Sequence, residues 1–400
     1  MIDNPLDTSM SRRSTLKLFA GLAAVPFPRR YRTQSPTPRR IGVIGGGIVG
    51  ASIAYHLARR GADVTVFERT GPAAGATQNS FAWINATFSK RPYAYYELNR
   101  LGGLGYRHLQ AEIGEDLHIK WGGTVQWFGE PKLARRLREQ VAHHQGWGYP
   151  TELIKEATFR DLEPMVEPLE VRAAAYSRQE GTLDPKKATE ALWAAARGAG
   201  ARFESPCEVT GIDQRWGRLR GVQTSRGDFE LDVVVIAAGV DTERLAAWTG
   251  LSVPLIESPG LLAHTHPTEP LLNHVVLAPG PHMKQNLDGR VVTGVGFGGK
   301  PSTDDSLANG ERILDDARRF VSGLKGVSVE RVSLGFRPLP RDGFPAVGFS
   351  SGAPDVYVAV MHSGVSMAPI MGPLVAAEIL DDRRVELLED FRLERFAKRG

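Results

Sequence analysis

Three glycines and a glutamate mark the first place where this chain could bind a ligand. Gly45, Gly47 and Gly50 follow the apolar run 41–44 in the spacing G-x-G-x-x-G, and Glu68 lies 18 positions beyond the third glycine. The first glycine permits a tight turn, the second lets the backbone approach a pyrophosphate, and the third lets a helix pack close to a sheet. Together these residues predict a dinucleotide site rather than an ordinary glycine-rich turn.

The helix expected to start near Ile48 and Val49 supplies the donors for such a ligand. Its first N–H groups have no partner inside the helix, and the positive end of its dipole favours a diphosphate. Glu68, followed by Arg69, would accept hydrogen bonds from the ribose hydroxyls. Because a carboxylate there repels a 2′-phosphate, the pattern disfavours NADP.

A second candidate region is the loop 71–80, which is rich in small and polar residues and contains Ala76 and Thr77. A simple nicotinamide dehydrogenase does not need such a loop directly after the ribose carboxylate. FAD binds in an extended conformation and needs a further loop over its pyrophosphate. The loop therefore favours FAD over NAD. Trp83 and Asn85 follow it two residues apart, so in an extended stretch they share a face that either meets the flavin or packs.

The elements that must position these groups return to one nucleotide domain three times. After the strand-helix-strand unit at 40–69, an apolar strand at 232–239 ends in Ala-Ala-Gly, which places small residues where a cofactor crosses strand ends. A strand at 356–360 and a helix at 367–380 follow near the C-terminus. Between these segments, short alternating runs over 261–333 predict antiparallel strands of a second layer.

Composition sets the class of protein. The chain has 400 residues, of which 42% are hydrophobic and 24% charged, values typical of a globular protein. Residues 1–40 carry eight basic and two acidic side chains, a balance of +6, so the whole-chain charge of +4 leaves about −2 for the remainder. We therefore expect no nucleic-acid partner. The single cysteine, Cys207, excludes an internal disulfide, and His143-His144 has no third ligand at metal-site spacing, so we expect no metal.

The leader, 1–38, has its own pattern. Ser11 to Lys17 contains paired arginines and precedes the small apolar stretch 18–25, the order of an export signal of the twin-arginine type. The stretch is too short to cross a bilayer, so we expect no stable membrane span. The alternative is a disordered basic tail on a cytoplasmic protein.

With these pieces in place, the sequence resembles the D-amino acid oxidase family of FAD-dependent amine oxidoreductases, which includes glycine oxidase, sarcosine oxidase and D-amino acid dehydrogenases. The likeness covers about 40–385 and depends on four ordered motifs. They are GGGIVG with Glu68, the loop 75–80, AAG at 237–239, and GFRPLPRDGFP with HSG near the C-terminus.

The resemblance implies an α/β (α+β overall) fold like that of D-amino acid oxidase and glutathione reductase. A Rossmann-like FAD-binding domain would comprise 39–100, 175–260 and 335–390. A mainly antiparallel β-sheet substrate domain would comprise 101–174 and 261–334.

The resemblance also assigns site residues. Arg337 would pair with the substrate carboxylate, because a planar guanidinium offers two parallel donors, and His362 is the other catalytic candidate. The implied FAD contacts are Gly45, Gly47, Ile48, Val49, Gly50, Glu68, Arg69, Ala76, Thr77, Val209, Ala238, Gly239, Arg337, Ser363, Gly364, Val365 and Ser366. The alternative for Arg337 is an arginine that only ties down its own loop.

Relatives that attach FAD covalently use a cysteine near the C-terminal motif or a histidine near the second loop. Cys207 is far from that motif in sequence, and no histidine lies between His56 and His108, so we expect non-covalent FAD. Lys284 and Lys300 are loosely aligned candidates for a lysine that supports reaction with oxygen.

The resulting hypothesis is oxidation of an amino acid or related amine by hydride transfer from the α-carbon to flavin N5. The imine would hydrolyse to an oxo acid, and oxygen or an electron carrier would reoxidise the flavin. The alternatives are a sarcosine-like secondary-amine dehydrogenase, a flavin-binding partner subunit without turnover, and an NAD dehydrogenase.

Overall fold

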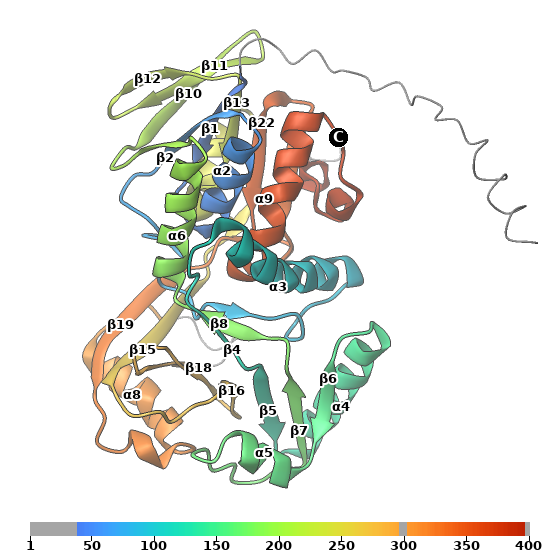
Figure 1. Ribbon diagram of the computed structural model, residues 1–400, viewed down its shortest axis with the longest axis vertical. Helices are drawn as coiled ribbons and strands as arrows, with labels where there is room; N and C mark the ends of the chain where they lie inside the picture. The colour runs from blue at the N-terminus through green and yellow to red at the C-terminus, as the bar shows by residue number, and fades with distance from the viewer. Residues whose placement is uncertain (1–37, 296–301, 397–400) are drawn as a thin grey trace, which may run out of the picture. The chain divides into compact units, whose positions relative to one another are not determined.

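The computed structural model describes residues 38–295 and 302–396, and Arg39–Gly400 make one compact unit (Figure 1). The predicted leader at 1–37 and the candidate Lys300 lie outside the described residues. Within the described ranges, the chain forms a parallel sheet covered by helices and a larger, mainly antiparallel sheet. The predicted fold class is confirmed.

The nucleotide sheet has six strands in the order β21-β22-β13-β1-β2-β9. All neighbours pair in parallel except β21 and β22. The strands are β1 (Arg40–Ile44), β2 (Asp63–Phe67), β9 (Arg202–Glu204), β13 (Val233–Ile236), β21 (Ala346–Ser350) and β22 (Ala353–Val360). Three segments far apart in sequence therefore build one sheet, as the sequence predicted.

Strand β13 shows why this sheet is buried on both faces. Val233 and Val235 face one apolar core, whereas Val234 and Ile236 face another, because side chains alternate along a strand. The first core packs against α2 (Ile48–Arg59), α3 (Tyr93–Ile113), α6 (Pro185–Gly198) and α9 (Gly364–Asp381). The second packs against a small sheet of β10 (Val209–Arg215), β11 (Arg218–Thr224) and β12 (Gly227–Glu230), with α7 (Thr242–Ala247) beside it.

One strand differs from its prediction. The expected strand at 201–209 is divided into β9, which ends at Glu204, and β10, which begins at Val209. Pro206 lies between them and has no N–H group to donate to a neighbouring strand.

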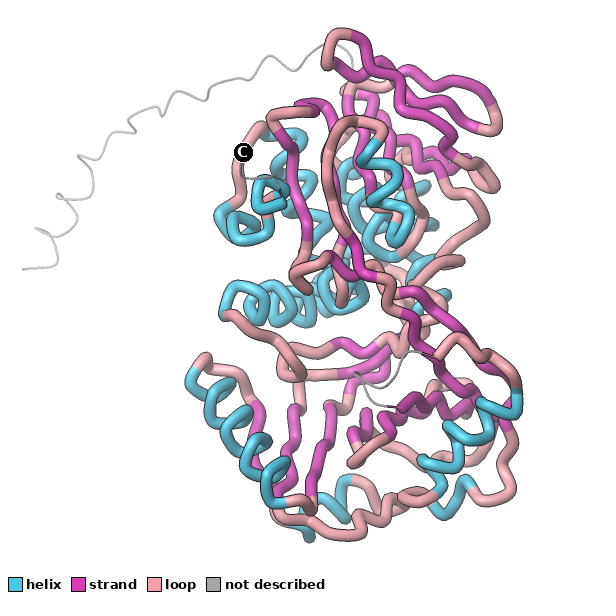
Figure 2. The backbone as a smooth tube through the Cα atoms, turned by 180° about the vertical axis from the view of Figure 1, so that it is seen from behind, coloured by secondary structure: helices cyan, strands magenta, loops and turns pink. Residues whose placement is uncertain are grey.

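The second sheet has eight strands in the order β19-β15-β18-β17-β16-β5-β7-β6, all antiparallel neighbours except β16 and β5. Its strands are β5 (Thr124–Phe128), β6 (Thr151–Ile154), β7 (Ala173–Ser177), β15 (Pro259–Pro267), β16 (Val275–Leu277), β17 (Pro281–Gln285), β18 (Arg290–Val295) and β19 (Val329–Phe336). Figure 2 shows α4 (Pro131–Gly146) and α8 (Leu307–Arg318) at opposite sides of this sheet.

Short elements complete the described chain. They are β3 (Trp83–Ile84), β4 (Ile119–Trp121) and β8 (Gly181–Leu183) in one sheet, β14 (Leu255–Ile256) paired with β20 (Leu339–Pro340), α5 (Glu156–Leu162), and four 3-10 turns at Gly239–Asp241, Ser322–Leu324, Glu386–Phe391 and Leu393–Phe396. The domain division predicted from the sequence stays a prediction, although α3, β7, β15 and β19 each continue across one of its boundaries.

Helix α9 packs against both α2 and α3, which fixes its first turn. Ser52 Oγ on α2 donates to the carbonyl of Ala368 at 2.7 Å, and Tyr106 Oη on α3 donates to the carbonyl of Val365 at 2.5 Å. Of the helices in the described ranges, α9 alone combines the length and apolar composition of a membrane span. It is 56% buried inside the protein, as a core helix is.

Candidate functional site

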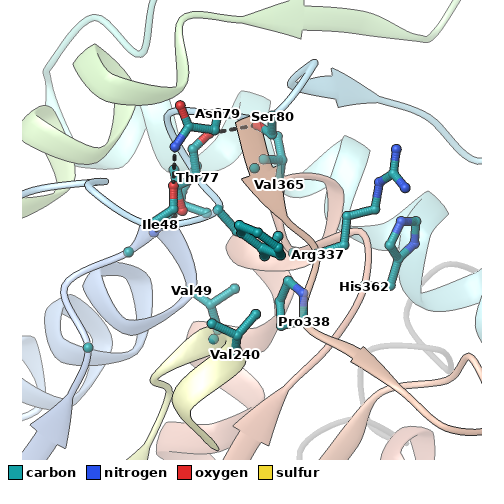
Figure 3. A pocket seen from close by; sticks show the side chains of 18 of the residues that line it. Ile48, Val49, Thr77, Asn79, Ser80, Val240, Arg337, Pro338, His362 and Val365 are labelled. Carbon is teal, nitrogen blue, oxygen red and sulfur yellow. Dashed lines mark hydrogen bonds between the residues drawn. The ribbon is translucent and has the colours of Figure 1, made fainter. Parts of the chain in front are cut away.

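One cavity of about 780 Å³ joins the nucleotide sheet to the second sheet. Its volume lies in the upper part of the range for small-molecule sites, about 300–1,000 Å³. Its walls come from the starts of α2 and α9, the loop 74–80, the ends of β13 and β22, and the beginning of β15 with the end of β19. Figure 3 shows Ile48 and Thr77 on one side of this cavity and Arg337 and His362 side by side on the other.

The turn between β1 and α2 needs glycine at two places. Gly45 has a φ of +109°, and a side chain there would meet the carbonyl oxygen of Ala237 at 2.4 Å. A side chain at Gly50 would meet the carbonyl oxygen of Gly45 at 2.1 Å. Gly50 therefore packs the helix against the turn and does not line the cavity, whereas Gly45 and Gly47 do.

Glu68 lies at the end of β2 and organises the backbone around it. Its Oε2 accepts a hydrogen bond from the N–H of Gly46 at 2.7 Å, and its Oε1 accepts from Thr70 at 2.8 Å and from Gly71 at 3.3 Å. A carboxylate oxygen has two lone pairs, so acceptor capacity remains for ribose hydroxyls. Glu68 thus positions its own loop and also lines the cavity.

The start of α2 presents donors to the cavity. Gly47 is the N-cap residue and provides no side chain to cap the helix. Thr77 Oγ1 accepts from the N–H of Ile48 at 3.3 Å, which brings the second loop to the start of the helix. The N–H of Val49 has no acceptor in the described part of the chain, so it remains available to an anion.

The start of α9 has a similar construction at the other side. Ser363 is its N-cap residue, but the Ser363 side chain makes no capping hydrogen bond to the helix. Within residues 38–295 and 302–396, the N–H groups of Gly364, Val365 and Ser366 bind no acceptor, and all three residues line the cavity. By contrast, Glu130, Asp184 and Ser306 cap α4, α6 and α8 with their side chains.

Arg337 lies just beyond β19, in the loop that the sequence singled out. Its Nη1 donates to Ser258 Oγ at 3.3 Å and to the carbonyl of Pro259 at 3.2 Å. Its Nε and Nη2 donate to no residue among those described, and a side chain at Gly260 would lie 2.7 Å from Nη2. One nitrogen thus ties down the loop, and the Nε–Nη2 edge remains free to pair with a carboxylate.

Charge and burial at this side favour an anionic ligand. Arg337 is half-buried, and burial lowers its pKa, yet a guanidinium stays protonated in proteins. No carboxylate of the described chain forms an ion pair with it. His362 is neutral, because burial and the charges of Lys90 and Arg337 lower its pKa to about 3.

Trp83 and Asn85 both line the cavity, so the face they share meets the site. Trp83 Nε1 donates to Thr124 Oγ1 at 2.9 Å and to Glu180 at 3.1 Å, which fixes the indole. Asn85 is only 9% exposed, and its Oδ1 has no hydrogen-bond partner in the described chain. A buried amide oxygen without a donor is unfavourable, so this atom indicates a ligand with an N–H or O–H group.

The cavity fits FAD on these observations. It offers an uncapped helix start for a diphosphate, a carboxylate for ribose hydroxyls, and a second uncapped helix start for a group that becomes negative. Every predicted cofactor residue except Gly50 lines it. Their individual roles remain predictions. In the described ranges, no three His, Cys, Asp or Glu side chains gather as metal ligands would.

Several residues of the site were not predicted from the sequence. Ser258, Pro259 and Gly260 line the cavity and surround the guanidinium, but no motif marks them. Cys207, which the sequence analysis set aside, also lines the cavity, and its N–H donates to the carbonyl of Glu68 at 2.7 Å. Lys284 does not line the cavity; its ammonium donates to Thr182 Oγ1 at 2.8 Å.

Comparison with known proteins agrees with this architecture. A model of the FAD dependent oxidoreductase family matches residues 40–378. The glycine oxidase of Geobacillus kaustophilus is 26% identical over 349 residues, which are 84% of this chain and 91% of that protein. The glycine oxidase of Bacillus licheniformis is 26% identical over 365 residues, 88% of this chain and 96% of that one. One of the two polypeptides of an opine oxidase from Agrobacterium tumefaciens is 27% identical over 370 residues, again 88% of this chain and 96% of that one.

Solved structures give the same result. The L-proline dehydrogenase from P. horikoshii has a TM-score of 0.82 and 26% identity, covering 90% of this chain and 98% of that one. The predicted family and the predicted FAD cofactor are both confirmed. The chain belongs to the FAD-dependent oxidoreductase family of D-amino acid oxidase type.

Proposed function

We propose that this FAD-dependent oxidoreductase oxidises an amino acid or a related amine that carries a carboxylate. The observation that supports this most strongly is Arg337, whose free Nε–Nη2 edge lies in the cavity without a carboxylate of the described chain. A buried cation needs a negative partner, and a substrate carboxylate matches the paired donors of a guanidinium.

The reaction removes two electrons and two protons from the substrate. Bound FAD would supply the oxidant and take up a hydride from the α-carbon. The nitrogen lone pair then forms the C=N bond, the amine loses a proton, and water hydrolyses the imine to an oxo acid and ammonia or a primary amine. Oxygen or an electron carrier would receive the two electrons.

The protein residues mainly bind and orient the substrate. Arg337 would fix the carboxylate, and Asn85 Oδ1 would accept a hydrogen bond from the amine. Neutral His362, with a pKa near 3, cannot supply a charged acid at ordinary pH. Positioning by such contacts lowers the barrier because the reacting atoms are held in an attack geometry.

The test is the substitution Arg337→Leu in FAD-loaded protein. We expect FAD to be retained and the anaerobic reduction of flavin by the best amino acid to slow by about 100-fold or more. Arg331→Leu is the matched control: Arg331 lies on the same strand, contacts His264 at 3.2 Å and does not line the cavity. Unchanged reduction by the Arg337 variant would contradict this anchor.

Two alternatives are separated by the same stopped-flow panel of D-amino acids, glycine, sarcosine and proline. A secondary-amine dehydrogenase would be reduced by sarcosine or proline and not by glycine, and it would recover slowly in air. A partner subunit without turnover would not be reduced by any of them. The second alternative has some support, since the opine oxidase relative is named as a subunit.

The leader at 1–38 supports a proposal on location. We propose that its paired arginines direct export of the folded, FAD-loaded protein by the twin-arginine route. Replacing Arg12 and Arg13 by lysine should leave a tagged chain in the cytoplasm, as judged by cell fractionation. An unchanged distribution would favour the cytoplasmic alternative.

A further inference from the structure

Lys90 is a buried cation that the proposed reaction has not used. It lies between β3 and α3, is only 4% exposed and does not line the cavity. Its Nζ donates to Ser363 Oγ at 2.5 Å and lies 4.9 Å from the centre of the Tyr95 ring. In residues 38–295 and 302–396, no carboxylate forms an ion pair with it.

Ser363 connects this cation to the cavity. Ser363 lines the cavity and precedes α9 with a φ of +61°, a conformation that residues other than glycine seldom adopt. A serine at this position usually accepts a hydrogen bond from the first turn of its helix. Here its oxygen accepts from Lys90 and from Tyr95 Oη at 3.1 Å instead, so the first N–H groups of α9 stay free.

The same contacts set the hydrogen positions on His362. With both lone pairs of Ser363 Oγ occupied by Lys90 and Tyr95, the serine hydroxyl has only its proton left to offer. His362 Nδ1 lies 3.0 Å from Ser363 Oγ and accepts that proton. A neutral ring that accepts at Nδ1 carries its hydrogen on Nε2, so His362 is a donor in the cavity wall.

This corner of the cavity is therefore positive, and no carboxylate of the described chain balances it. Lys90 and Arg337 are both cations, the start of α9 adds the positive end of a helix dipole, and His362 offers an N–H group. Buried charges are usually paired, so the imbalance indicates a bound anion. Arg337 presents its own edge to the cavity, whereas Lys90 reaches it only through Ser363.

We propose that Lys90 is a positioning residue which, through Ser363 and His362, stabilises negative charge on the flavin ring when the ring is reduced. This inference depends on the proposed function for its biological use, but not for its test. Positive charge and fixed donors aimed at a site of developing charge stabilise that charge because they need no reorganisation. The substrate carboxylate belongs to Arg337 in this assignment.

The test compares FAD-loaded wild type with Lys90→Met, Lys90→Arg and Ser363→Ala, using sulfite and the flavin reduction potential. Sulfite adds to oxidised flavin, leaves negative charge on the ring and bleaches its absorbance, and it requires no amine substrate. We expect Lys90→Met to bind sulfite about tenfold more weakly and to have a lower reduction potential, while Lys90→Arg stays within about threefold of wild type. Lys120→Met is the matched control, because Lys120 is a partly buried lysine that donates to the carbonyl of Leu272 at 2.7 Å and does not line the cavity.

Each outcome decides the proposal. Equal sulfite affinity and potential in wild type and Lys90→Met would overturn it, as would a change confined to the binding of N-acetylglycine, which would assign Lys90 to the carboxylate. If Lys90→Met does not fold, Ser363→Ala decides alone, since it keeps the lysine and removes the connection. A wild type that binds sulfite but is reduced by no amino acid would contradict the proposed function and leave the assignment of Lys90 standing.

Discussion

The two ends of the cavity are both built at the start of a helix, yet they are assembled in opposite ways. The α2 end comes from one continuous stretch, 40–71, and contains a carboxylate, Glu68, that holds its own loop through backbone N–H groups. The α9 end draws side chains from four separate segments and contains two cations without a partner carboxylate in the described chain. Local backbone geometry thus forms the first end, and long-range side-chain contacts form the second.

The difference teaches which function each end can serve. Backbone N–H groups and glycines recognise a diphosphate that many proteins share, so the α2 end identifies a cofactor class and no substrate. The α9 end has an unbalanced positive charge and a buried amide oxygen without a donor among the described residues, and these are features that a substrate can complete. Substitutions at the two ends should therefore separate cofactor binding from substrate binding.

The largest effect is expected from Gly50→Ala at the α2 end. A methyl group there would lie 2.1 Å from the carbonyl oxygen of Gly45, so the turn must move and FAD should be lost. The measurement is the FAD content of purified protein by absorbance. Gly71→Ala is the control, since a side chain at Gly71 meets nothing within 4 Å. Normal FAD content in the Gly50 variant would mean that this turn does not hold the diphosphate.

A smaller effect, confined to substrate, is expected from Asn85→Ala at the α9 end. FAD should be retained, and the KM for the best amino acid should rise about tenfold, because the amine loses its acceptor. Asn99→Ala is the matched control: Asn99 is also buried, its Oδ1 likewise has no partner in the described chain, and it lies outside the cavity. If both variants keep the wild-type KM, Asn85 contacts no part of the substrate.

The smallest effect concerns pH. The native pKa of His362 is about 3, below its ordinary value of 6.5, so the unfolded chain binds the proton more readily. The stability that this group contributes is present above pH 6.5 and is lost as pH falls toward 3. We expect the free energy of unfolding to be about 2 kcal/mol lower at about pH 5 than at about pH 7 for this histidine.

Chemical denaturation at saturating FAD measures that slope. His264 and His282 have pKa values near 3 for the same reason, burial, and steepen it further. His362→Gln should therefore make the pH dependence shallower without removing it. Identical slopes in wild type and variant would show that His362 is not held neutral by the positive α9 end.

The sequence predicted the α2 end more completely than the α9 end, for a physical reason. Gly45, Gly47 and Glu68 lie in one strand-helix-strand unit, where spacing along the chain fixes spacing in three dimensions. Lys90 and Ser363 are 273 residues apart, and their contact depends on how α3 packs against α9, which no local pattern encodes.

Arg337 shows an intermediate case. Its loop and its role followed from the family resemblance, but Ser258 and Gly260, which hold its guanidinium, come from the start of another strand. The packing reason for Gly260 is visible only in the structure, because Nη2 occupies the space of its missing side chain.

The most direct test is a crystal structure of the FAD-loaded protein with N-acetylglycine, a carboxylate that cannot be oxidised at an acylated amine. The account predicts ribose hydroxyls on Glu68, the flavin ring at the first turn of α9, and the carboxylate on the Nε–Nη2 edge of Arg337. A carboxylate bound elsewhere, with that edge of Arg337 facing solvent, would contradict it.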